Sequence, residues 1–112
     1  MPYSLNEGSA SALGQLGAIH VSGDTNAVTA PTGFVFIAIQ FLETSVFDSG
    51  TSGLVSAVAQ QFPDSTTAST NIDANGGAVV NSEAFPQGMT IYGRWSEFLL
   101  DSGRVVAYLG YK

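Results

Sequence analysis

Few side chains in this sequence could perform catalysis, and the single histidine is the first to consider. A serine–histidine–aspartate arrangement would have to use His20 as its general base, because the chain has no other histidine. His20 stands between Ile19 and Val21, and such alternation is typical of a short strand. We therefore expect His20 to face solvent or a polar neighbour, without a catalytic role.

Nine carboxylates could act in acid–base chemistry or bind a cation, but they are scattered along the chain. Five lie in or beside predicted turns, which aspartate favours for backbone reasons. These five are Asp24, Asp48, Asp64, Asp73 and Asp101. With one histidine and no cysteine, a zinc or other transition-metal site would need three or more carboxylates. We predict no cofactor and no metal site, although a calcium ion among loop carboxylates stays open.

The motifs of common enzyme sites are also absent from the sequence. Gly50-Thr51-Ser52-Gly53 has neither the length nor the lysine of a P-loop, and no Gly-x-Ser-x-Gly elbow occurs. No EF-hand loop is present, and nothing points to a glycosidase pair of carboxylates. We therefore predict that the protein is not an enzyme.

The charge balance argues against two kinds of partner. Acidic residues outnumber basic ones by 9 to 3, for a net charge of -6. The basic residues Arg94, Arg104 and Lys112 cannot form a nucleic-acid footprint, which draws on several contacts to phosphate. An anionic membrane surface is disfavoured for the same reason.

The start has no signal-peptide pattern, and the longest strongly apolar run, residues 34–42, is about half a membrane span. We expect synthesis in the cytoplasm without classical export.

Length and composition predict one folded domain. The chain has 112 residues, 45% of them hydrophobic and 11% charged, against roughly 25% charged in an average globular chain. Residues 1–17, rich in serine, alanine and glycine, read as a loosely ordered N-terminal arm or a frayed terminus. Residues 18–112 read as a single β domain. Without cysteine, its stability does not depend on redox state.

The strongest predicted element is a strand over residues 34–42, which is apolar on both faces. Simple alternation assigns Phe36 and Ala38 to one face, and Ile37 and Ile39 to the other. Residues 104–109 show the same two-sided pattern. Either these strands are central in a two-layer core, or their second face is a protein-contact surface.

Turn signals organise the rest of the chain. Asn75-Gly76 predicts a hairpin between residues 72–74 and 78–80, and residues 101–103 predict another between 89–100 and 104–109, with Gly103 left-handed. A change of apolar phase predicts a bulge near Ser96, and Gly93 leaves room for a backbone or a bulky ring. Residues 54–62 fit a helix or a strand, and residues 63–71 a surface loop. The predicted fold is all-β, a small antiparallel sandwich or barrel.

Four segments carry a resemblance to a known group of proteins. They are IHVSGDTN (19–26), FVFIAIQFLE (34–43), GMTIYGRW (88–95) and SGRVVAYLG (102–110). Their layout resembles small virion structural proteins of tailed phages, particularly those of marine or cyanobacterial hosts. The shared motifs are structural, and the resemblance implies an all-β fold, repeated copies and no enzymatic role.

The resemblance implies a capsid decoration (cement) protein on the capsid exterior, bound to the major capsid protein or to copies of itself. A tail or receptor-binding (adhesin) module, with exposed aromatic residues in a glycan-binding patch, is the alternative. A small enzyme using His20 or a carboxylate pair is a third possibility. The candidate interface residues are Leu5, Leu13, Leu16, Tyr92, Trp95, Tyr108 and Tyr111.

Overall fold

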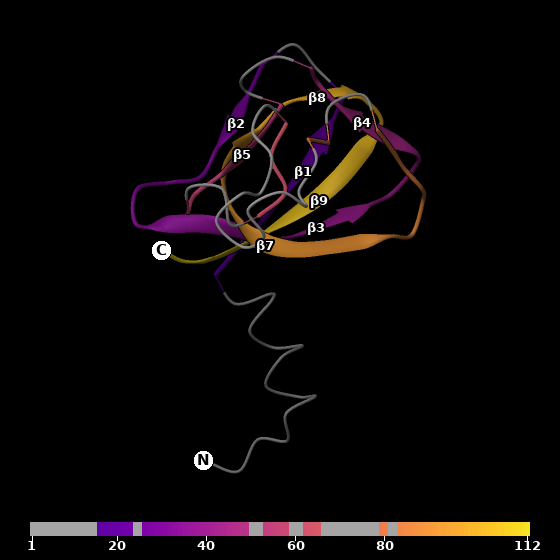
Figure 1. Ribbon diagram of the computed structural model, residues 1–112. Coiled ribbons are helices and arrows are strands. Elements are labelled where there is room, and N and C mark those ends of the chain that lie inside the picture. The colour runs from indigo at the N-terminus through magenta and orange to yellow at the C-terminus, as the bar shows by residue number, and fades with distance from the viewer. Residues whose placement is uncertain (1–15, 24–25, 50–52, 59–61, 66–78, 81–82) are drawn as a thin grey trace.

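The chain folds into two antiparallel β-sheets that curl around one core (Figure 1). The computed structural model describes residues 16–23, 26–49, 53–58, 62–65, 79–80 and 83–112. Within these ranges there are nine strands and no helix. The predicted all-β, antiparallel sandwich-like or barrel-like fold is thereby confirmed. Most of the predicted N-terminal arm, including Leu5 and Leu13, lies outside the described residues.

The larger sheet has five strands in one path and a sixth beside it. In order, the path is β1 (Ala18–Ser22), β9 (Arg104–Tyr111), β3 (Phe34–Phe41), β7 (Thr90–Phe98) and β2 (Val28–Thr29). The sixth strand, β5 (Leu54–Ser56), also pairs with β7. The smaller sheet is β6 (Ala84–Phe85), β4 (Ser45–Phe47) and β8 (Leu100–Ser102). Both β3 and β7 lead into it through short connections to β4 and β8, so the two sheets enclose one interior.

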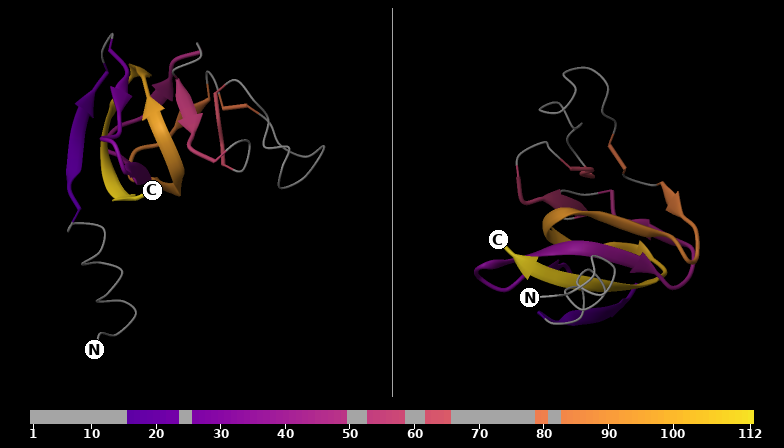
Figure 2. Two further views of the ribbon diagram at one scale, coloured as in Figure 1. Left: turned by 90° about the vertical axis from the view of Figure 1, so that its left-hand side faces the viewer. Right: turned by 90° about the horizontal axis from the view of Figure 1, so that it is seen from below.

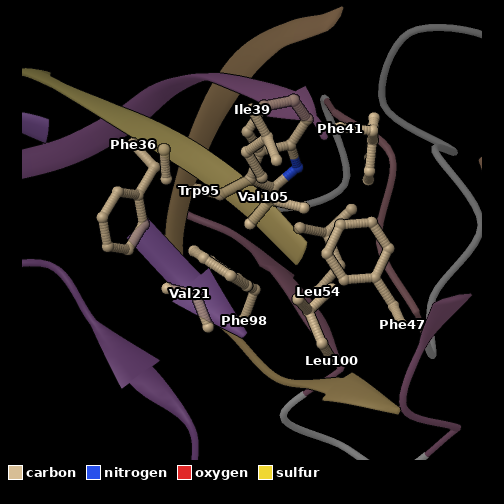
Figure 3. Close-up of a cluster of buried hydrophobic side chains, with 11 residues drawn as sticks. Val21, Phe36, Ile39, Phe41, Phe47, Leu54, Trp95, Phe98, Leu100 and Val105 are labelled. Atoms are coloured by element: carbon tan, nitrogen blue, oxygen red, sulfur yellow. The ribbon is translucent and has the colours of Figure 1, made fainter. Parts of the chain in front are cut away.

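Phenylalanine rings from both sheets fill that interior (Figure 3). Phe41 stacks on Phe85 with ring centroids 4.8 Å apart, and Phe47 meets both rings edge-on. Phe98 makes edge-on contacts with Phe47 at 6.1 Å and with Phe36 at 5.2 Å. Rings of this size dominate the apolar area that a small domain can bury, so they hold the two sheets together.

A bulge at Ile37 changes which side chains of β3 face the core. Opposite β9, Phe36 pairs with Leu109 and Ala38 with Tyr108, which leaves Ile37 as an extra residue. An extra residue reverses the alternation of all that follows. Phe36 and Ile39 therefore both belong to the core cluster, which does not include Ile37 or Ala38. The assignment of Phe36 with Ala38, and of Ile37 with Ile39, was wrong for this reason.

The predicted hairpin between residues 89–100 and 104–109 is also wrong. β7 and β9 do not pair, because β3 lies between them in the sheet. The chain leaves β7, forms β8 in the smaller sheet and then turns into β9. Gly103 at that turn does adopt the expected left-handed conformation, with φ 97°. The predicted bulge is confirmed, since Val55 pairs with Glu97 and Ser56 with Trp95, with Ser96 between them.

The ambiguous segment after Gly53 begins as strand β5, and side chains cover the edge of that strand. The backbone N–H of Leu54 donates to Ser65 Oγ at 3.0 Å, and that of Ser56 donates to Asp64 Oδ2 at 3.1 Å. Asp64 and Ser65 are also buried, which corrects their assignment to a surface loop. The Asn75-Gly76 hairpin lies outside the described residues.

Candidate contact face

The side of the larger sheet that is turned away from the core is the candidate functional surface. Figure 2 shows β1, β9, β3 and β7 side by side in this sheet. The strand register aligns their outward residues in two adjacent rows. One row is Tyr92, Ala38, Tyr108 and Ala18, and the next is Thr90, Gln40, Val106 and His20. These residues, together with the bulged Ile37, are called the outer face below.

Aromatic and aliphatic side chains make up the middle of the outer face. Tyr92 pairs with Ala38 of β3, and its side chain is 65% exposed. The half-buried Tyr108 places its hydroxyl 3.4 Å from Gln40 Oε1. Ile37 lies over Gly110, where an added Cβ would approach its Cγ2 to 2.5 Å. Gly110 is buried beneath Ile37, and Ala38 is buried as well, so the larger side chains form the accessible part of this face.

Arginine side chains flank the outer face. Arg104 follows the second row on β9, and its Nε lies 3.0 Å from Glu43 Oε2, with both side chains about half exposed. Arg94 follows Tyr92 on β7, and its Nη2 donates to the carbonyl oxygen of Tyr111 at 3.2 Å. Although the chain has a net charge of -6, the two rows contain no carboxylate. The face is therefore an uncharged surface of aliphatic, aromatic and amide or hydroxyl side chains, bordered by Arg94 and by the Arg104–Glu43 pair, on an acidic protein.

The structure separates the predicted interface residues into groups. Tyr92 and Tyr108 lie on the outer face. Tyr111 is 68% exposed, but it lies on the opposite side of the sheet, where its ring stacks on Phe34 at 5.6 Å. Leu16 is half-buried just before β1. Leu5 and Leu13 lie outside the described residues.

Trp95 was wrongly assigned to an exposed aromatic patch. Its side chain is fully buried, and its indole Nε1–H donates to the carbonyl oxygen of Pro63 at 2.7 Å. The cause is strand phase, because Trp95 pairs with the core residue Phe36 and faces inward with it. Sequence reasoning also missed Ile37 as an outward residue. The two-sided apolar pattern of residues 34–42 did indicate a second apolar face, but only the bulge assigns Ile37 to it.

A hollow of about 270 Å³ lies beside the N-terminal end of β3, at Phe34 and Val35. Its wall consists of residues 29–35 together with Ser56, Ala57, Ser96 and Lys112. The stacked pair of Phe34 and Tyr111 adjoins it. The lining thus combines threonine, serine and lysine residues with the aromatic Phe34, a composition suited to a small polar ligand.

His20 is exposed on β1, as predicted. Where the structure describes the chain, no three histidine, cysteine or acidic side chains gather closely enough to hold a metal ion. The same ranges include no helix with the length and apolar character of a membrane span. No protein-family model, curated protein or solved structure matches this chain.

Proposed function

We propose that the protein is a non-enzymatic structural protein of a phage virion that decorates the exterior of the capsid. The observation that carries the proposal is the outer face, a surface without carboxylates in its two rows and with two tyrosines, held on a sheet outside the hydrophobic core. Its partners are the major capsid protein and neighbouring copies of the chain. The resemblance of residues 19–26, 34–43, 88–95 and 102–110 to phage virion proteins supports this assignment.

The outer face has the properties of a docking surface. Tyrosine and arginine are enriched at protein interfaces, where they supply large contact areas. Tyr92 and Tyr108 stand on paired strands, so little backbone freedom is lost when they are covered. Arg94 and Arg104 lie at the border, where charge contributes more to orientation and association rate than to affinity.

A pair of matched tyrosine variants tests the proposal. Capsids assembled without the protein are incubated with the wild type, with Tyr92→Ser or with Tyr111→Ser, and occupancy is measured by quantitative gel or cryo-electron microscopy. Tyr92 and Tyr111 are almost equally exposed, at 65% and 68%, on opposite sides of the sheet. Tyr92→Ser is expected to weaken capsid binding by about tenfold or more, as for an interface hot spot. Wild-type occupancy with Tyr92→Ser would refute the outer face as the docking surface.

The hollow beside Phe34 favours a second function, a tail or receptor-binding module. Its lining combines Phe34, which stacks on Tyr111, with threonine, serine and lysine residues, and this composition is suited to a glycan. In that case Tyr111→Ser weakens binding to host-surface glycans while Tyr92→Ser has no effect, the reverse of the capsid result. Copy number gives an independent answer, because many copies per particle favour a decoration protein and few copies favour a tail component.

A further inference from the structure

Strand β1 is an open edge of the larger sheet. It pairs with β9 on one side, and no other strand in the described ranges pairs with it. Both views of Figure 2 place β1 at the outside of the sheet. An open edge presents backbone donors and acceptors to any other strand that approaches it.

The edges of strands β5 and β1 differ in how their backbone groups are covered. At β5, the side chains of Asp64 and Ser65 occupy backbone N–H groups of the strand. Within the described residues, β1 contains no proline, lysine or carboxylate, and its register with β9 is continuous, so it has neither a blocking side chain of these types nor a bulge. Ile19 on this strand is 40% exposed. The edge of β1 can therefore form backbone hydrogen bonds with another β-strand.

The hydrogen bonds to β9 identify the backbone groups that are free to pair. The carbonyl oxygen of Gly17 accepts from Leu109 N at 3.0 Å, and the N–H of Gly23 donates to Gly103 O at 2.6 Å. Backbone groups of successive strand residues point to opposite sides. The backbone N–H and C=O groups of residues 17, 19, 21 and 23 thus point toward β9. The N–H and C=O groups of Ala18, His20 and Ser22 point away from it, toward the open edge.

We propose that β1 pairs antiparallel with β1 of a second copy, about a two-fold axis that passes beside His20. This register brings together the outward-pointing residues, with His20 opposite its counterpart and Ala18 opposite Ser22 of the second copy. The strand Ala18–Ser22 is self-complementary about its centre, with small residues at both ends and β-branched residues inside.

The same register covers the exposed isoleucine. Ile19 and Val21 both lie on the core side of β1, but Val21 is only 8% exposed and Ile19 is 40% exposed. In the pair, Ile19 of each copy lies opposite Val21 of the other, so the apolar layer continues across the junction. The two outer faces become parts of one continuous sheet. This pairing does not depend on the proposed function, because it follows from β1 alone.

The oligomeric state of the full chain tests the pairing. Sedimentation velocity over a concentration series is expected to show a reversible dimer. His20→Pro removes the central outward N–H, whereas His20→Thr keeps it on a residue that favours strands. His20→Pro is expected to raise the dimer dissociation constant at least about tenfold, and His20→Thr to change it little. Trp95 fluorescence checks that each variant is folded. Ile19→Lys is a second variant that disfavours pairing of β1 with β1 of the second copy.

Spin labels locate the contact. The chain has no cysteine, so a single introduced cysteine carries a unique nitroxide. A label at position 20 lies beside the two-fold axis and is expected to show strong dipolar broadening. A label at Thr90, in the same row but on β7, is expected to show none, because its counterpart lies on the order of 30 Å away. A chain that stays monomeric, a dimer indifferent to His20→Pro, or broadening at 90 instead of 20 would each overturn the proposal.

Discussion

The indole ring of Trp95 lies against the backbone of Gly93, two residues earlier on the same strand. A Cβ added at Gly93 would lie 2.8 Å from both Cη2 and Cζ2 of Trp95 and 3.0 Å from a ring carbon of Phe62. This confirms the expectation that Gly93 leaves room for a bulky ring. The glycine and the bond from Trp95 Nε1–H to Pro63 together hold the ring in the core.

Gly93→Ala should therefore destabilise the protein by about 1–3 kcal/mol, because two rigid rings would have to move. Urea denaturation followed by Trp95 fluorescence measures the change. In a Trp95→Phe background, followed by circular dichroism, the same substitution should cost less, because the smaller ring leaves more space. An equal cost in both backgrounds would show that the contact is not the cause.

Ser65→Ala should cost about 1–3 kcal/mol, because it leaves the buried N–H of Leu54 without its hydroxyl acceptor. The matched control is Ser22→Ala on β1, where the serine is exposed and the change should stay within about 0.5 kcal/mol. Chemical denaturation of the two variants measures the difference. Equal stabilities would contradict the assigned edge cover of β5.

Phe98→Ala should cost about 3–5 kcal/mol, because Phe98 is fully buried and contacts rings in both sheets. Phe34→Ala removes a ring of the same size, but one that is half-buried and stacked on an exposed tyrosine. It should cost clearly less than Phe98→Ala. Thermal unfolding of both variants gives the comparison, and a reversed order would mean that the ring cluster does not hold the sheets together.

Glu43→Gln should lower the free energy of unfolding by no more than about 1 kcal/mol, because the pair with Arg104 is half-exposed and screened by water. The effect should shrink further in 1 M salt, where the screening length is about 3 Å. Denaturation at low and high salt checks this. A loss that persists in high salt would indicate a role for Glu43 other than the ion pair.

Local patterns predicted several features of the fold correctly. The strand over residues 34–42, the left-handed Gly103, the bulge near Ser96 and the exposed strand position of His20 all follow from neighbouring residue types. The hairpin between residues 89–100 and 104–109 failed. Its two strands have a good turn between them, but β3 offers both of them a partner from a distant part of the chain.

The candidate surface shows the same division. Tyr92, Tyr108 and Trp95 are all predicted interface residues; Tyr92 and Tyr108 lie on the outer face, whereas Trp95 is buried. All three are aromatic residues in predicted strands, so residue type could not separate them. Tyr92 and Trp95 lie three residues apart on β7 and therefore face opposite sides of the sheet. Which of the two sides faces the core is decided by the packing of the two sheets.

The sequence by itself determined that the domain is built of strands, because β-branched and aromatic runs are bounded by glycine, proline and aspartate. Only the tertiary structure decided the strand order and the direction of each side chain. Alternation repeats every two residues, so one extra residue at Ile37 exchanges the faces of everything beyond it. Pairing between distant strands selects such bulges, and through them the side chains that form the outer face.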